Sequence, residues 1–128
     1  MKEKEIKVLK VEPCKAPELV TLNNNLDSLQ KAVSIGADEQ GLIEIINLDA
    51  KTCILCNEEG KLIGLEPNRR FYDDVLVGVF YVCGQDKRGN LASLSLKGIE
   101  RYSMLFADTS KVNVTDEDLF RLCEITVL

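Results

Sequence analysis

Apolar and polar residues alternate in several short stretches of this chain, which is the pattern of half-buried β-strands. These stretches, rich in Val, Ile, Leu and Cys and bounded by turn residues, are residues 5–11, 18–23, 42–48, 52–57 and 91–96. The run VLVGVFYVCG, residues 75–84, is predicted to be the strongest strand of all. Short connections between neighbouring stretches favour a mostly antiparallel sheet.

After the second of these stretches the pattern changes to a helical period. Leu26, Leu29 and Val33 recur three or four residues apart, and an Asn precedes them as an N-cap. Gly36 follows at the place of a C-cap. One amphipathic helix of about three turns is predicted here.

The C-terminal third carries two further helical patterns. The segment LKGIERYSMLFAD could be helical, and a helix is predicted at about residues 116–123, where Thr115 and Asp118 resemble a capping box. Neither a repeat nor a flexible linker divides the 128 residues. We therefore predict an α+β fold, a single compact domain over residues 1–128 with a mostly antiparallel sheet and two or three helices packed on one face.

The balance of charges argues against some partners. Sixteen Lys and Arg against 21 Asp and Glu give a formal net charge of −5, so we expect no nucleic acid polymer as the partner. The chain has no apolar run of the length of a membrane span or a signal peptide. We expect a cytoplasmic protein that does not bind membranes, with its five cysteines reduced.

The chain contains no histidine, which removes the commonest general base and the commonest zinc ligand. The pair Cys53 and Cys56 has CxxC spacing, but residues three apart on a strand point to opposite faces of the sheet. Two such sulfurs could not share one metal ion, and the acidic turn that follows would raise a thiol pKa. We expect no metal, no cofactor and no enzymatic activity.

The segment CNEEGKLIGLEPNRR, residues 56–70, has the least ordinary composition of the chain. Its first half is predicted to be a strand, a tight turn and a strand, with a positive φ at Gly60. Its second half places Pro67, which stiffens the backbone, immediately before an amide and two guanidiniums.

Rigid placement of Asn68, Arg69 and Arg70 suits recognition of a phosphate, a carboxylate or a base edge. The alternative is a structural clasp, in which one of these arginines pairs with a nearby carboxylate: Glu66, Asp73 or Asp74.

Several segments, in a consistent order, give the chain a resemblance to a known family. They are VEP (11–13), NNLDSLQ (24–30), CNEEGKLIGLEPNRR (56–70), VGVFYVCG (77–84) and SLSL with IERY (93–102). Over about residues 5–107 the chain resembles the DUF3846 family, small proteins of Gram-positive bacteria, their plasmids and their phages. The resemblance implies one compact α+β domain and a frequent association with mobile elements, and it brings no established activity.

Two classes of function fit these observations. The first is a non-catalytic phage or mobile-element protein that binds and sequesters a small anionic, nucleotide-like ligand, such as an immune signal. The predicted ligand-binding residues are Asn57, Asn68, Arg69, Arg70 and Tyr72. Together with Phe71 and Phe80, Tyr72 could stack a base. The alternative is a protein-interaction module that inhibits or regulates a host or mobile-element protein, and a homo-oligomer is expected in either case.

Overall fold

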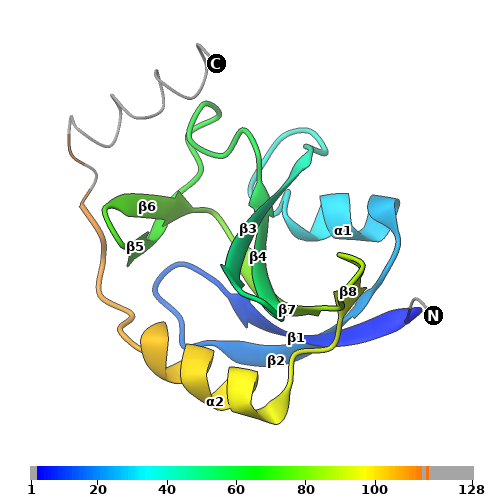
Figure 1. Cartoon of the computed structure of the whole chain (residues 1–128). Coiled ribbons are helices and arrows are strands. Elements are labelled where there is room, and N and C mark those ends of the chain that lie inside the picture. Colours follow the sequence, from blue (N-terminus) through cyan, green and yellow to red (C-terminus); the bar gives the residue numbers. More distant parts are fainter. Residues whose placement is uncertain (1–2, 114, 116–128) are drawn as a thin grey trace.

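A computed structural model of the chain describes residues 3–113 and residue 115 (Figure 1). The helix predicted at about residues 116–123 lies outside this part of the chain. The described elements are, in order, β1 (Glu5–Val11), β2 (Glu18–Asn23), α1 (Leu26–Ala32), β3 (Ile43–Asp49), β4 (Thr52–Asn57), β5 (Pro67–Phe71), β6 (Asp74–Val77), β7 (Phe80–Gln85), β8 (Leu91–Ala92) and α2 (Leu96–Leu105).

Within the described part of the chain, the main sheet has six strands. Its order is β2-β1-β7-β4-β3, and β8 pairs with the end of β7. A separate sheet consists of β5 and β6 alone, and the strands of both sheets pair antiparallel. The strand-rich α+β class, with a mostly antiparallel sheet, is therefore confirmed.

The prediction of one strand over residues 75–84 is wrong, because this run is divided between β6 and β7. Gly78 lies at the division with a φ of 69°, a conformation that favours glycine. Its N–H donates a hydrogen bond to the Glu66 carbonyl at 2.7 Å. An added Cβ at Gly78 would lie 2.7 Å from Cδ1 of Leu65, so the space also requires glycine. One apolar run thus supplies strands to two sheets.

Helix α1 is confirmed where the helical period predicted it. The Asn25 side chain caps it by accepting a hydrogen bond from the Ser28 N–H at 2.9 Å. The helix ends at Val33 rather than at the predicted Gly36, which has a φ of 87° in the turn that follows. The predicted C-cap was therefore one turn too late.

Helix α2 begins after Ser95, whose side chain accepts a hydrogen bond from the Gly98 N–H at 3.0 Å. The strand predicted at residues 91–96 is therefore too long. Only β8, Leu91–Ala92, is a strand, because the cap at Ser95 begins a helix. None of the described helices is long and apolar enough to cross a membrane.

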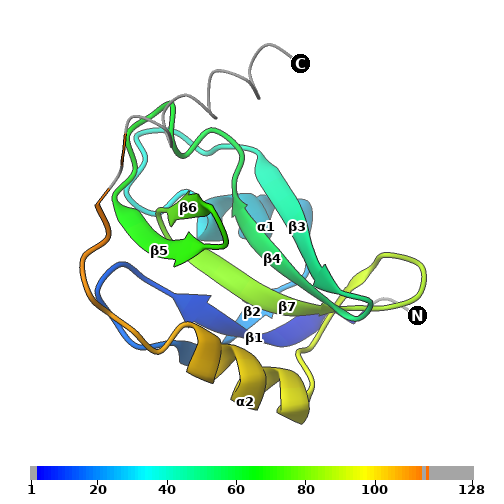
Figure 2. The same cartoon turned by 60° about the vertical axis from the view of Figure 1, so that its left-hand side comes forward.

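Both faces of the main sheet are covered, so the prediction that the helices pack on one face is wrong. On one face, Ile6 and Val8 of β1 belong to the same core cluster as Leu29 of α1. On the other face, Leu9 of β1 lies in a cluster with Tyr102 of α2. The central strands are apolar on both faces, and each face needs a cover to exclude water. In Figure 2, α1 lies behind the main sheet, while α2 and the β5–β6 hairpin lie on the near side.

Candidate functional site

The connection between β4 and β5 consists of turns, so the predicted second strand after Gly60 is wrong. The positive φ, 74°, occurs at Gly64 rather than at Gly60. Gly60 is required for packing instead, because an added Cβ would lie 2.8 Å from a methyl of Val77. Strand β4 already pairs with β3 on one side and β7 on the other, which leaves no edge for a further strand.

Asn68 lies on β5 and is buried, with 1% of its surface exposed. Its amide nitrogen donates to the carbonyls of Val11 and Gly78, at 2.8 Å each. Its amide oxygen accepts from Nη1 of Arg69 at 2.7 Å. The side chain ties the end of β1 to the connection between β6 and β7 and does not face solvent.

Arg69 is also buried, with 4% of its surface exposed. Its guanidinium donates to the carbonyl of Phe106 at 3.1 Å and to that of Lys15 at 2.6 Å. A longer hydrogen bond, 3.4 Å, reaches the Glu12 carbonyl. Burial lowers the pKa of Arg69, and the charge of Asp108 partly offsets this. Arg69 is a structural clasp whose partners are main-chain carbonyls in place of the predicted carboxylates.

Asn57 is buried at the end of β4. Its amide nitrogen donates to the Val33 carbonyl at 3.3 Å, and its oxygen accepts from the Glu59 N–H at 2.9 Å. Arg70 is exposed, and its Nη2 donates to the Asn113 carbonyl at 3.1 Å. The five predicted ligand-binding residues therefore do not converge on one site, and three of them are buried structural residues.

Tyr72, the fifth predicted residue, is 86% exposed at the tip of the β5–β6 hairpin. Phe71 pairs with Asp74, so the loop between them has two residues. Tyr72 is the first of the two and has a φ of 54°, where hairpins of this length prefer glycine. A bulky residue in this conformation costs about 1–2 kcal/mol. Such strain, where it is observed, points to a function for the side chain.

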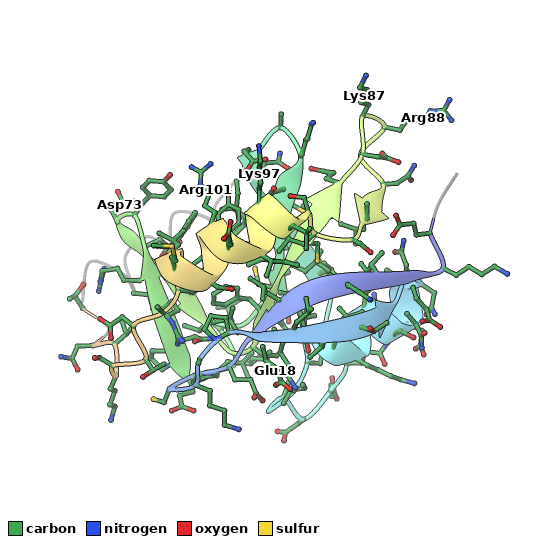
Figure 3. The ribbon with its side chains drawn as sticks, turned by 90° about the horizontal axis from the view of Figure 1, so that it is seen from below. Glu18, Asp73, Lys87, Arg88, Lys97 and Arg101 are labelled. Carbon is green, nitrogen blue, oxygen red and sulfur yellow. The ribbon has the colours of Figure 1, made fainter. Side chains whose placement is uncertain are left out.

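A groove of about 450 Å³ runs beside this tip, between the hairpin, the end of β3 and α2. Its lining is Leu48, Phe71, Tyr72, Arg101, Tyr102, Met104 and Leu105. Met104, on the rim, is 80% exposed. In Figure 3, Arg101 of α2 and the hairpin tip marked by Asp73 lie on the same side of the molecule. The groove thus combines aromatic and aliphatic walls with one guanidinium.

The exposed side chain of Arg101 lies over the ring of Tyr102. Its Cζ lies 5.6 Å from the centroid of the Tyr102 ring, a cation–π distance. The Tyr102 hydroxyl donates to the Asp49 carboxylate at 2.8 Å. Burial raises the pKa of Tyr102, and its hydrogen bond to Asp49 raises it further. Burial acts to raise the pKa of Asp49 too, but hydrogen bonds from Lys51 and Tyr102 outweigh it, so that this pKa is lowered.

A second, smaller cavity of about 120 Å³ lies between β3, β4 and β6. It contains the ion pair of Lys61 and Asp74 and the thiol of Cys56, whose pKa burial raises to about 12. Cys53 and Cys56 belong to core clusters on opposite faces of the sheet, as their spacing on a strand predicts. The described residues contain no group of three or more side chains that could hold a metal ion.

The sequence reasoning missed the α2 wall of the groove. A signal was present, since Ile99, Tyr102 and Phe106 form the apolar stripe that packs on the sheet. Leu96 and Met104 lie outside this stripe and are exposed. Large apolar residues on the outer side of an amphipathic helix indicate a second contact surface.

Comparison with known proteins gives one match. Residues 6–107 match the model of a family described as Domain of unknown function (DUF3846), in agreement with the resemblance over about residues 5–107. A search of curated proteins and a search of solved structures each return no match.

Proposed function

The chain belongs to the DUF3846 family, whose description assigns no activity, and we propose a function for it from the geometry of the groove. We propose that the protein is a non-catalytic binder that holds and sequesters a small anionic, nucleotide-like ligand between α2 and the β5–β6 hairpin. One observation carries the proposal: Tyr72, which is exposed and has a strained backbone, lines the same groove as Arg101. The proposed site keeps Tyr72 and adds Arg101, and it does not include the buried Asn68 and Arg69.

The aromatic wall supports binding of a planar group. The Phe71 and Tyr72 rings lie 4.6 Å apart between centroids in an edge-to-face arrangement, so each ring orients the other. Stacking of one nucleic acid base on an aromatic side chain contributes about 1–3 kcal/mol. The aliphatic side chains of Leu48 and Leu105 complete an apolar lining for such a base.

Arg101 supports binding of a negative charge. Among the described residues it forms no ion pair, so its guanidinium is available to a phosphate or a carboxylate. The Tyr102 ring beneath it is fixed by the hydrogen bond to Asp49. A cation that is already positioned loses little side-chain freedom on binding.

The residues near the groove favour binding without turnover. Asp49 accepts the hydrogen bond of Tyr102, and its pKa is lowered, which keeps the carboxylate ionised near neutral pH. A general acid or base needs a pKa near the working pH. We extend the proposal to sequestration of an immune signal in the host cytoplasm, in keeping with the mobile-element association that the family resemblance implies.

The test starts with the purified protein, which is denatured so that any retained small molecule can be identified by mass spectrometry. Calorimetric titration then compares nucleoside phosphates and cyclic dinucleotides with uncharged nucleosides. We expect binding of anionic compounds only, weakened about tenfold or more by Arg101→Gln and by Tyr72→Ala. Arg88→Gln removes an exposed cation from the β7–β8 loop and serves as the matched control. Absence of both a retained compound and a binding signal would rule the proposal out.

A second candidate function rests on a different observation. Leu96, Met104 and Leu105 of α2 are each more than half exposed. Exposed methionine and leucine on a helix are typical of protein-binding surfaces. A stoichiometric host partner, recovered with the wild-type protein and lost with Met104→Ser, would favour the protein-interaction module.

A further inference from the structure

The two ends of the molecule have complementary chemistry. Figures 1 and 2 both place the β4–β5 connection at one end of the domain and α2 at the other. We propose that the β4–β5 loop of one copy inserts into the α2 groove of a second copy. The partner assigned to the groove here is therefore another molecule of this protein.

The β4–β5 loop, residues 58–64, presents an apolar tip within an acidic surround. Leu62 is 60% exposed and Ile63 is half-exposed, while Glu58 and Glu59 beside them are exposed to solvent. The turn is fixed by a hydrogen bond from the Ile63 N–H to the Glu59 carbonyl at 3.0 Å. A shape that is fixed before association loses less conformational entropy on binding.

Leu65 anchors the loop to its own domain. It is buried, and its N–H donates to the Gly60 carbonyl at 3.0 Å. Its side chain packs against the backbone at Gly60 and Gly78. The two apolar side chains at the tip therefore project from a firmly held base.

The groove has the opposite character to the loop. It is apolar inside, and its cation, Arg101, is joined by Lys97 four residues earlier on the same exposed side of α2. Copies of a molecule with a net charge of −5 repel each other, so a contact between the acidic loop and the cations Lys97 and Arg101 is favoured over a contact between two acidic surfaces.

The contact has consequences for assembly. It joins two different surfaces, so a dimer leaves one loop and one groove unused, and growth continues until a ring closes or the concentration becomes limiting. The contact is small, and we expect weak, reversible association. If the proposed function also holds, the ligand and the loop compete for the groove, and binding of the ligand dissociates the assembly.

Charge exchange provides the test, by sedimentation velocity over a range of protein concentrations with no ligand added. Arg101→Glu places an acidic groove opposite an acidic loop, and the double variant Glu58→Lys/Glu59→Lys places a basic loop opposite a basic groove. Each variant alone should stay monomeric at concentrations where the wild type associates. An equimolar mixture of the two should associate again, because each loop then meets a groove of opposite charge.

Two further measurements make the result specific. Leu62→Ser should weaken association about tenfold, whereas Leu26→Ser, at an equally exposed leucine on α1, should leave it unchanged. The chain has no tryptophan and three tyrosines, of which Tyr72 is the exposed one, so association should reduce acrylamide quenching of the tyrosine emission. A wild type that stays monomeric throughout, or a mixture that does not associate, would overturn the inference. Protein that has been unfolded, freed of any retained small molecule and refolded is used throughout, so that an occupied groove does not prevent association.

Discussion

Two arginines of this domain show how differently the same side chain is used. Arg69 on β5 is buried, and its guanidinium donates to main-chain carbonyls of two other segments, the β1–β2 connection and the end of α2. Arg101 on α2 is exposed at a groove and rests on an aromatic ring. The first connects parts of the fold and the second is available to a partner. The comparison shows that an arginine can bind a partner only if its N–H groups do not already donate to carbonyls of the fold.

The largest effect is expected at the buried arginine. Arg69→Ala should lower the free energy of unfolding by about 3–4 kcal/mol, because it removes charged hydrogen bonds and the donor to the Phe106 carbonyl in a buried position. Arg101→Ala should change it by less than about 0.5 kcal/mol. Urea unfolding of both variants measures the contrast. Equal losses would show that the two arginines do not divide into a structural one and an available one.

Asn68→Leu keeps the size of the side chain and removes its hydrogen bonds. The carbonyls of Val11 and Gly78 then lose their donors, and we expect a loss of about 2–3 kcal/mol. Asn47→Leu, at an exposed position on β3, is the control and should have little effect. A loss below about 0.5 kcal/mol for Asn68→Leu would mean that the clasp depends on Arg69 alone.

A smaller effect is expected beneath Arg101. Tyr102→Phe removes the hydrogen bond to Asp49 and should cost about 1 kcal/mol at neutral pH. Because the pKa of Asp49 is lowered in the fold, its contribution is present above its unfolded pKa, near 3.9, and is lost as the pH falls through the folded value. Unfolding measured between neutral pH and pH 3 should therefore show a weaker acid dependence in Tyr102→Phe than in the wild type. An unchanged acid dependence would contradict this coupling.

The smallest effect on stability is expected at the hairpin tip. Tyr72→Gly relieves the left-handed strain but loses the ring contact with Phe71, so the unfolding free energy should rise by about 1 kcal/mol at most. Binding in the groove should nevertheless be weakened. Thermal unfolding and calorimetry on the same preparation separate the two quantities. A clear loss of stability would show that Tyr72 is retained for the fold and not for a partner.

Local features of the fold could be predicted from the sequence. Alternation located β1 to β4, and the helical period located α1, because these patterns depend on neighbouring residues. The CxxC pair was correctly assigned to opposite faces for the same reason. The division at Gly78 was missed because apolar residues continue on both sides of it, and only the close approach of Leu65 requires a turn there.

The candidate site was less predictable. Besides the carbonyl of the adjacent Asn68, the carbonyls that accept from Arg69 belong to residues 37 to 57 positions away in the chain. Every residue carries a carbonyl, so its identity gives no sequence signal for such a contact. Asn68 and Arg69 therefore have the residue types of a ligand-binding site, but both side chains are buried. On α2, by contrast, the exposed apolar residues lie outside the buried stripe of the helix. Their helical spacing is sufficient to predict the α2 wall of the groove from the sequence.

The clasp also has a consequence for the order in which parts of the molecule open. A sheet of two strands is marginally stable by itself, so β5 and β6 depend on their attachment to the body of the domain. Asn68 and Arg69 contribute to that attachment near the base of the hairpin, while the tip forms one wall of the groove. Backbone amides of β5 and β6 should exchange with deuterium sooner than those of β4 and β7, through an opening that leaves the main sheet closed. The groove would then lose a wall without global unfolding, and Arg69→Ala should make that event more frequent.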